Sequence, residues 1–137
     1  MNRPILTLFL LLSFLSTRAQ QPSIMDLRGC WDILDKQIPG AKLEIVDSST
    51  IYLSLGEDRK KIISYTIDLS RTPAWFDFTI ENSGKNIEVK SILQFFGESV
   101  MKWQLFINED RATHFSAGRG GWMFLKRYRE DPVVAIK

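Results

Sequence analysis

The chain has 137 residues, of which 45% are hydrophobic, 25% charged and 12% aromatic, and it contains a single cysteine. This composition is typical of a globular protein and excludes a disordered, collagen-like or disulfide-stapled chain. The length is typical of a single domain. The formal charge of +2 reflects Arg3 and Arg18, because without them the 18 basic residues fall to 16, equal to the 16 acidic ones. A basic nucleic-acid-binding surface is therefore not expected.

The amino-terminal segment has the three parts of a secretory signal peptide. Arg3 provides a positive start, Ile5–Leu15 is an almost uninterrupted apolar run, and Thr17-Arg18-Ala19 is a small-x-small cleavage motif. The run is too short to span a bilayer, which takes about 20 residues. An uncleaved amphipathic anchor is the alternative, although the run is apolar on all sides. The sequence thus predicts a signal peptide over 1–19 and a mature protein over 20–137, exported to the periplasm or the exterior, without a stable membrane span.

Apolar and polar residues alternate along most of the remaining chain, which is typical of half-buried strands. The alternating segments are Leu27–Asp35, Ala41–Asp47, Thr50–Leu55, Lys60–Leu69, Ala74–Glu81, Ile87–Phe96, Ser99–Asn108 and Trp122–Tyr128. A short helical turn is expected near Ile24–Leu27, and a loosely attached tail from about residue 129.

Eight one-sided strands with short connections favour an all-β fold, namely an eight-stranded antiparallel up-and-down barrel whose closure removes exposed sheet edges. A β-sandwich is the alternative, because periodicity does not distinguish two packed sheets from one closed sheet. No segment has helical periodicity over three turns, so a parallel α/β fold is not expected.

Four motifs, taken in chain order, resemble those of small bacterial exported lipocalin-like domains of unknown function, a calycin-type group. They are a Leu-x-Gly-x-Trp opening, a strand that contains proline and aspartate, a hairpin with a central glycine, and a closing Lys-Arg strand preceded by an Arg-to-Phe segment. Here they lie at Leu27–Trp31, Pro73–Phe78, Ile92–Val100, and Arg111–Phe115 with Leu125–Arg127. Ala112 departs from the pattern, which has proline there. The resemblance implies the barrel more directly than it implies transport.

In lipocalins a basic residue on the closing strand stacks over the tryptophan of the opening motif and seals the barrel, which the resemblance places at Gly29, Trp31 and Arg127. A cation over an indole face contributes about 0.5–2 kcal/mol, and the indole supplies a large apolar area to plug an open end. We therefore expect Trp31 to pack inside, near Arg127 or, failing that, Arg129. The expected role is closure of the fold.

The reactive side chains do not favour an enzyme. His114 is the only histidine and Cys30 the only cysteine, whereas metal sites built on these residue types need several ligands and a Cys–His nucleophile needs a third, orienting group. Gly118–Gly121 lacks the Lys-Ser/Thr of a phosphate-binding loop. We expect neither a metal nor a cofactor. Cys30 is expected to be buried, and a disulfide-linked dimer is the alternative.

Inward-facing positions of the expected strands collect aromatic residues, and the ligand-lining candidates are Tyr65, Phe76, Phe78, Phe95 and Trp103. A small eight-stranded barrel is either filled by side chains or holds one small ligand. A ligand of this chain would be a small hydrophobic molecule, with Tyr65 as its polar contact. The expected function is thus non-enzymatic binding of such a molecule. The alternative is a filled barrel that acts as a protein-interaction or structural module through its loops, of which Glu109–Gly121 is the longest.

Overall fold

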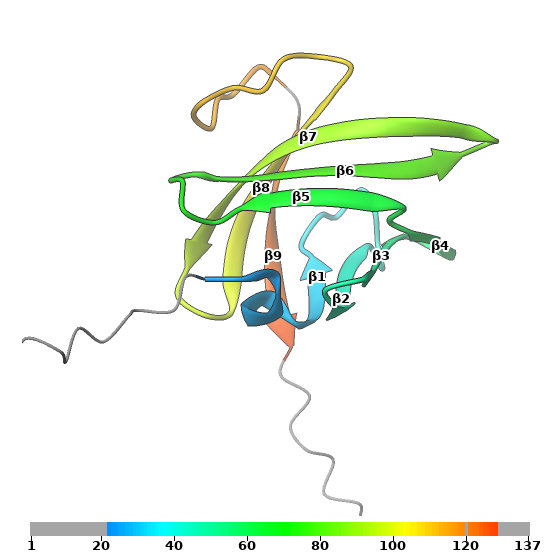
Figure 1. Cartoon of the computed structure of the whole chain (residues 1–137), viewed down its shortest axis with the longest axis horizontal. Helices are drawn as coiled ribbons and strands as arrows, with labels where there is room; N and C mark the ends of the chain where they lie inside the picture. Colours follow the sequence, from blue (N-terminus) through cyan, green and yellow to red (C-terminus); the bar gives the residue numbers. More distant parts are fainter. Residues whose placement is uncertain (1–21, 120, 129–137) are drawn as a thin grey trace, which may run out of the picture.

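The computed structural model describes residues 22–119 and 121–128. Over these residues the protein is a nine-stranded all-β domain with one short 3-10 turn, η2 (Ile24–Leu27), where the sequence predicts a helical turn (Figure 1). The predicted signal peptide over 1–19 and the predicted tail from residue 129 lie outside the described residues. Among the residues described, no helix is long and apolar enough to cross a membrane.

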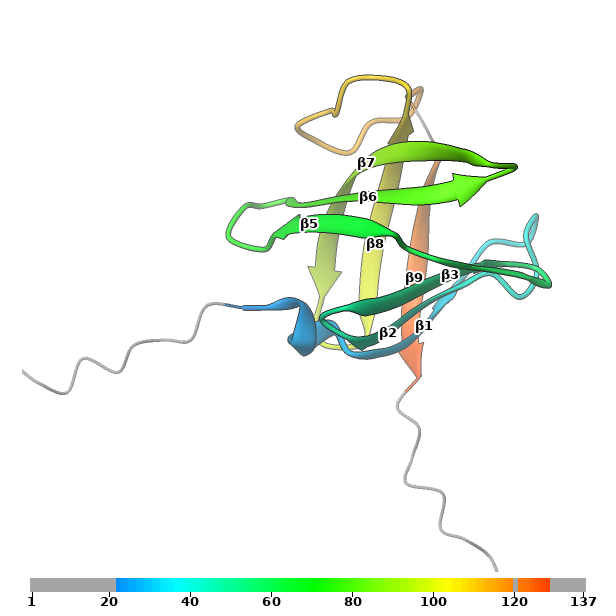
Figure 2. The same ribbon diagram turned by 45° about the vertical axis from the view of Figure 1, so that its right-hand side comes forward.

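All nine strands belong to one antiparallel sheet. In chain order they are β1 (Gly29–Ile33), β2 (Lys42–Asp47), β3 (Thr50–Leu55), β4 (Asp58–Lys61), β5 (Ser64–Asp68), β6 (Ala74–Asn82), β7 (Lys85–Phe96), β8 (Val100–Ile107) and β9 (Trp122–Tyr128). Their order in the sheet is β4-β3-β2-β1-β9-β8-β7-β6-β5. The sheet curls into a half-barrel (Figure 1, Figure 2). The predicted all-β barrel-type fold is confirmed, and one continuous sheet excludes the sandwich.

The sheet joins the first and last of the described strands and leaves its free edges in the middle of the sequence. The first strand, β1, pairs with the last, β9, in a register that places Trp31 opposite Arg127. The two edge strands are instead β4 and β5, which follow each other in the chain. The meander is therefore closed where its ends meet, and it is open between two consecutive strands.

The prediction of one strand over Lys60–Leu69 is wrong, and this accounts for nine strands in place of eight. The main chain changes partner within one peptide unit: Ile62 N–H donates to Ile51 O of β3, whereas Ile63 N–H donates to Thr79 O of β6, both at 2.9 Å. Ile62 is buried, but Ile63 is 54% exposed instead of facing the core as its alternation suggests. The chain crosses here from one edge of the sheet to the other.

The core fills the concave face of the sheet. Side chains from β1, β2, β3, β6, β7, β8 and β9 meet there, in keeping with the period-two alternation of their strands. The largest fully buried apolar ones are Trp31, Leu43, Ile51, Phe76, Leu93, Met101, Trp103 and Leu125. They form one hydrophobic cluster together with Ile24 and Leu27 of η2. Aromatic and branched side chains thus occupy the space that a wider barrel would leave for a ligand.

Candidate functional site

Four of the five ligand-lining candidates come together in one aromatic cluster. Ring centroids are 6.1 Å apart for Tyr65 and Phe76, 5.2 Å for Phe76 and Phe78, 6.1 Å for Phe76 and Trp103, and 5.8 Å for Phe78 and Trp103. These separations are in the range of favourable aromatic pairs. Phe76, Phe78 and Trp103 are buried, and Tyr65 is half-buried. Tyr65 is therefore the member of this cluster that reaches the surface.

Ser91 holds the cluster in place, although it is not among the residues predicted from the sequence. The indole Nε1 of Trp103 donates to Ser91 Oγ at 2.8 Å, and Ser91 Oγ donates in turn to the main-chain oxygen of Phe76. Ser91 is fully buried. A lone hydroxyl among the inward-facing apolar positions of β7 is the signal that could have identified it, because a buried polar group requires a partner.

The fifth candidate, Phe95, is not part of the cluster, and its assignment to the interior is wrong. Its side chain is 37% exposed, whereas Leu93, two residues earlier on β7, is buried. Phe95 stands opposite Met101, next to the turn between β7 and β8. Alternation gives the face of a strand but not the burial of each position along it, and Phe95 is the last residue but one of β7.

Tyr65 crosses the gap between β5 and the turn that joins β2 to β3. Its hydroxyl donates to the main-chain oxygen of Ser48 at 2.5 Å. Partial burial, with a smaller contribution from the nearby Asp47 carboxylate, raises the pKa of the Tyr65 hydroxyl above its usual value. The hydroxyl is therefore protonated at neutral pH and available as a donor.

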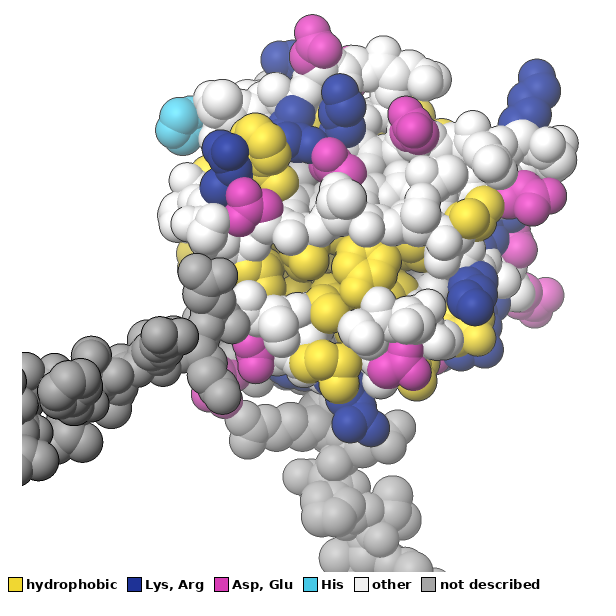
Figure 3. Space-filling view, viewed as in Figure 1, with side chains coloured by type: hydrophobic (Ala, Val, Ile, Leu, Met, Phe, Trp, Pro, Cys, Tyr) yellow, Lys and Arg dark blue, Asp and Glu magenta, His cyan; other side chains and the backbone are white. Residues whose placement is uncertain are grey.

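An apolar opening lies beside β5, and we call it the seam. It is bordered by β5 with Leu69 on one side, and by η2 and the β2–β3 turn (Asp47–Thr50) on the other. Both ribbon views separate β5 from η2, and Figure 3 shows hydrophobic side chains gathered in a hollow between them. Tyr65, Ile67 and Leu69 are half-buried against the core, and Met25 of η2 is 43% exposed. The seam is thus a place where the core reaches the surface.

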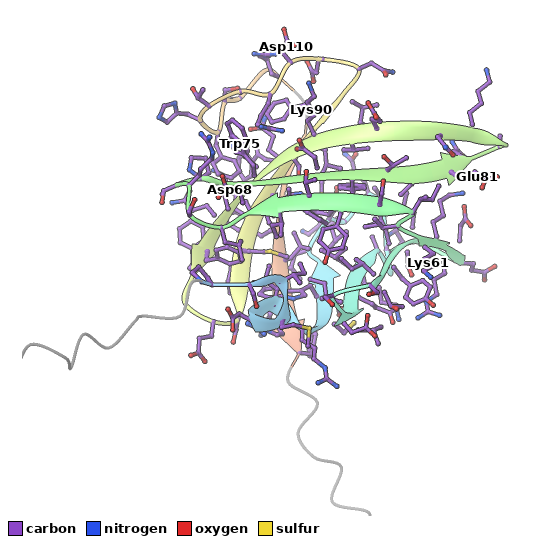
Figure 4. All side chains as sticks on the ribbon, in the orientation of Figure 1. Lys61, Asp68, Trp75, Glu81, Lys90 and Asp110 are labelled. Carbon is purple, nitrogen blue, oxygen red and sulfur yellow. The ribbon has the colours of Figure 1, made fainter. Side chains whose placement is uncertain are left out.

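The elements that border the seam carry three carboxylates, Asp26, Asp47 and Asp68, and no basic residue. The pKa of Asp47 is lowered, first by the hydrogen bond from the Ser49 N–H. The pKa of Asp68 is lowered as well, first by the Ser70 hydroxyl and then by Arg71, whose Nε lies 2.9 Å from a carboxylate oxygen. Both groups are ionised at neutral pH. Figure 4 shows Asp68 at the far end of β5 from β4.

The part of the barrel where β1 meets β9, which we call the floor, is closed by Trp31 and Arg127. Trp31 is fully buried, and its Nε1 donates to Leu27 O at 2.8 Å. The Arg127 guanidinium carbon lies 4.6 Å from the centroid of the Trp31 ring. Its nitrogens donate to the main-chain oxygens of Glu98 at 2.5 and 3.1 Å, Asp26 at 3.0 Å and Arg28 at 3.2 Å. Of the two partners expected for Trp31, it is therefore Arg127 that stacks on the ring.

Gly29 allows Arg127 to pass over β1. A Cβ atom at this position would lie 3.3 Å from Arg127 Cδ and 3.7 Å from its Cγ, and the residue has a φ of +132°. Residues that carry a side chain rarely adopt this backbone conformation, whereas glycine adopts it readily. Both the close approach of the Arg127 side chain and the positive φ angle therefore favour glycine at position 29.

Cys30 and His114 lie in surroundings that do not prepare them for catalysis. Burial, followed by the nearby Asp32 carboxylate, raises the pKa of the half-buried Cys30 thiol, so the reactive thiolate is disfavoured. His114 is exposed, and its Nδ1 lies 2.9 Å from Thr113 Oγ1. In the parts of the chain that the structure describes, no group of three or more His, Cys, Asp or Glu residues is placed to hold a metal ion.

The long segment before β9 is anchored to the outside of the barrel. Arg111 forms an ion pair with Asp77 and stacks on Trp75, with its guanidinium carbon 3.8 Å from the ring centroid. The buried side chain of Gln104 donates to the main-chain oxygens of Ser116, at 3.0 Å, and of Arg119. Trp75 lies below this segment and Asp110 within it (Figure 4).

A second group of aromatic residues, which we call the outer strip, lies exposed on β7 and β9. It contains Phe96, Trp122 and Phe124, with ring centroids 6.2 Å apart for Phe96 and Phe124 and 5.6 Å for Trp122 and Phe124. Lys102 Nζ lies 4.3 Å from the Trp122 ring and 4.6 Å from the Phe115 ring. No motif in the sequence predicts a role for this strip.

Comparison with known proteins supports the fold alone. No family model matches the chain, and no curated protein matches it. Among solved structures, the chain is similar to Tp0751 (pallilysin) of Treponema pallidum, with a TM-score of 0.52 and 15% sequence identity over 93% of this chain and 100% of the other. At this identity the likeness shows a shared β-barrel-type architecture.

Proposed function

We propose that the protein is an exported, non-enzymatic, lipocalin-like binding protein that takes an apolar group into the seam. The observation that supports this proposal is the hollow beside β5, where half-buried Tyr65, Ile67 and Leu69 lead from the surface to the aromatic cluster. An apolar recess with a few polar contacts is the usual form of a binding site. Tyr65 supplies the polar contact at its rim.

The seam is a better binding place than the lumen. Trp31, Phe76, Met101 and Trp103 are at most 1% exposed and occupy the interior. A ligand in the lumen would have to displace tightly packed side chains, and rearranging a packed core is costly. At the seam, a ligand needs only to cover side chains that are already partly exposed.

Two sequence features support export and binding over catalysis. The predicted signal peptide supports an exported protein. The protonated Cys30 thiol and the exposed His114 provide no activated nucleophile, since such a residue needs a lowered pKa or an adjacent base. The motifs shared with lipocalin-like domains agree with this role.

Titration with the uncharged dye Nile red tests this proposal. We expect its fluorescence to rise on binding, and we expect Leu69→Asn to weaken binding because Leu69 is half-buried at the seam. Leu34→Asn is the matched control, because Leu34 is 56% exposed and lies outside the seam. Equal affinity for the wild type and Leu69→Asn would contradict the proposal.

The outer strip favours a second candidate function, a protein-interaction module. Trp122 is 44% and Phe96 49% exposed, and aromatic residues are enriched where proteins bind each other. The anchored segment before β9 contributes Phe115 to the same surface through Lys102. Under this alternative, Trp122→Ser abolishes co-purification of a partner from the source, and Leu69→Asn leaves it intact.

A further inference from the structure

Strand β5 leaves one side of its main chain without a neighbour. It pairs with β6 along Ser64–Asp68, and it ends the sheet order on its other side. The N–H and C=O groups on that side therefore have no strand partner among the described residues. Such an edge is a template for pairing with another chain unless it is covered or charged.

The other edge of the sheet has the protection that β5 lacks. All four residues of β4, Asp58–Lys61, are charged, and three of them are exposed. Charged side chains, lysine above all, are a common means of preventing edge-to-edge pairing. β5 has one charged residue, Asp68 at its end, and its apolar side chains face the seam. The sheet is therefore open to pairing at β5 and protected at β4.

The pattern of β5 specifies the chemistry of an occupant. A ladder needs donors and acceptors repeated at strand spacing, which an extended polypeptide has and a lipid chain lacks. Tyr65 and Ile67 lie on the core side, and Ser64, Thr66 and Asp68 alternate with them. A strand added next to β5 would therefore place every second side chain in the apolar hollow.

Charge further restricts the occupant. The bordering elements carry Asp26, Asp47 and Asp68 and no basic residue. Arg71 pairs with Asp68, and Lys61 lies near Asp47. The Asp26 carboxylate accepts from the Ser23 N–H, and Arg127 donates to the Asp26 main-chain oxygen; all three cations lie outside the bordering elements. Lys or Arg on either side of a bound segment would be attracted to this border, and an anionic lipid headgroup would be repelled.

We propose that an extended peptide segment of a partner protein, apolar at alternate positions and flanked by Lys or Arg, adds to β5 and closes the seam. This inference rests on the proposed function and names the class of molecule that the seam accepts. The Tyr65 side chain occupies the gap and must release Ser48 O as the peptide enters. Tyr65 thus acts as a latch on the seam.

The test uses the fluorescently labelled peptide KVTVTVTK and two control peptides. The first control has the same side chains but its six central amides are N-methylated, which removes the main-chain donors. The second is EVTVTVTE, with acidic ends. We expect KVTVTVTK alone to bind by fluorescence anisotropy, and we expect it to slow hydrogen exchange of the amides in Ser64–Asp68. The preference over EVTVTVTE should decrease as salt is added.

Three variants locate the binding. We expect Ile67→Asn to weaken binding by about tenfold or more, because the seam loses an apolar contact, and we expect Thr66→Asn on the polar side of β5 to leave it nearly unchanged. Tyr65→Phe should strengthen binding by about twofold to tenfold, because opening the latch no longer breaks a hydrogen bond. If Ile67→Asn fails to fold, the Tyr65→Phe result and the exchange data on the wild type decide.

The outcomes separate this inference from the proposed function. Seam-dependent Nile red binding without KVTVTVTK binding would overturn the peptide proposal and leave the proposed function standing. Equal binding of the N-methylated peptide would overturn strand addition. Failure of both probes would overturn both proposals.

Discussion

The floor and the seam are two closures of the same barrel, and they differ in how many contacts hold them. At the floor, a fully buried indole lies under a guanidinium that donates to three main-chain oxygens. At the seam, one tyrosine hydroxyl donates to one main-chain oxygen across a half-buried gap. Several charge-assisted bonds around a buried ring stabilise more than one hydrogen bond near solvent.

This difference indicates which part of the barrel can open. Separating the floor would expose Trp31 and leave several carbonyl groups unpaired, whereas separating the seam breaks the hydrogen bond between Tyr65 and Ser48 O of the β2–β3 turn. Local opening occurs where buried apolar contacts are fewest. The floor therefore closes the fold, and the seam is the more weakly held closure, where we propose that binding occurs.

The largest effect that we expect is at the floor. Trp31→Ala should lower the free energy of unfolding by about 3–5 kcal/mol, because it removes a fully buried aromatic side chain. Trp122→Ala is the matched control; its indole is 44% exposed, so the loss should stay below about 1 kcal/mol. Chemical denaturation measures both. A loss of less than about 1 kcal/mol for Trp31→Ala would remove the distinction between floor and seam.

Arg127→Met should have an intermediate effect of about 2 kcal/mol, because it keeps an apolar stem over Trp31 and removes the donors to the three carbonyl oxygens. The matched change at the seam, Tyr65→Phe, removes one hydrogen bond and should cost about 0.5–1.5 kcal/mol. Urea unfolding of the two variants side by side tests the order. If Tyr65→Phe costs more than Arg127→Met, the seam is the stronger closure.

The smallest effect that we expect is on the stability of the protein at acidic pH. The folded-state pKa of Asp47 and of Asp68 is lowered, so their stabilising contribution is present above the ordinary value of 3.8 and is lost as the pH falls through the lower folded-state pKa. The melting temperature of the wild type should therefore exceed that of a double Asp47→Asn, Asp68→Asn variant at pH 7, and the difference should shrink near pH 3. A constant difference would show that the charges of these carboxylates do not stabilise the borders of the seam.

The sequence is sufficient to predict most of the strands and four of the five candidate aromatic residues, because both depend on local alternation. Phe76 and Phe78 lie two residues apart on one strand, so they must share a face. Trp31 and Arg127 follow from the resemblance to lipocalin-like domains, in which the first and last strands are neighbours. The structure has the same pairing, because β1 pairs with β9 and Trp31 lies opposite Arg127.

The seam could not be predicted in this way, because it depends on which strand the chain pairs with next. The alternation of apolar and polar residues predicts one strand through Ile62 and Ile63. In the structure, however, the main-chain N–H groups of these two residues donate to different strands. The seam results from that change of partner. The same reason applies to Arg111, whose partners Trp75 and Asp77 lie on a strand more than thirty residues earlier in the chain.

The arginine at the floor ties completion of the sheet to the presence of its last strand, β9. Arg127 bonds to the main chain of Arg28 and Asp26, which lie 99 and 101 residues earlier in the sequence. Hairpins between successive strands close short loops and form readily, whereas this contact closes a loop of nearly the whole domain. A nascent or truncated chain that ends before residue 127 can build its hairpins but keeps Trp31 uncovered. Emergence of the last strand is thus the step that joins two sets of hairpins into one curled sheet with a closed floor.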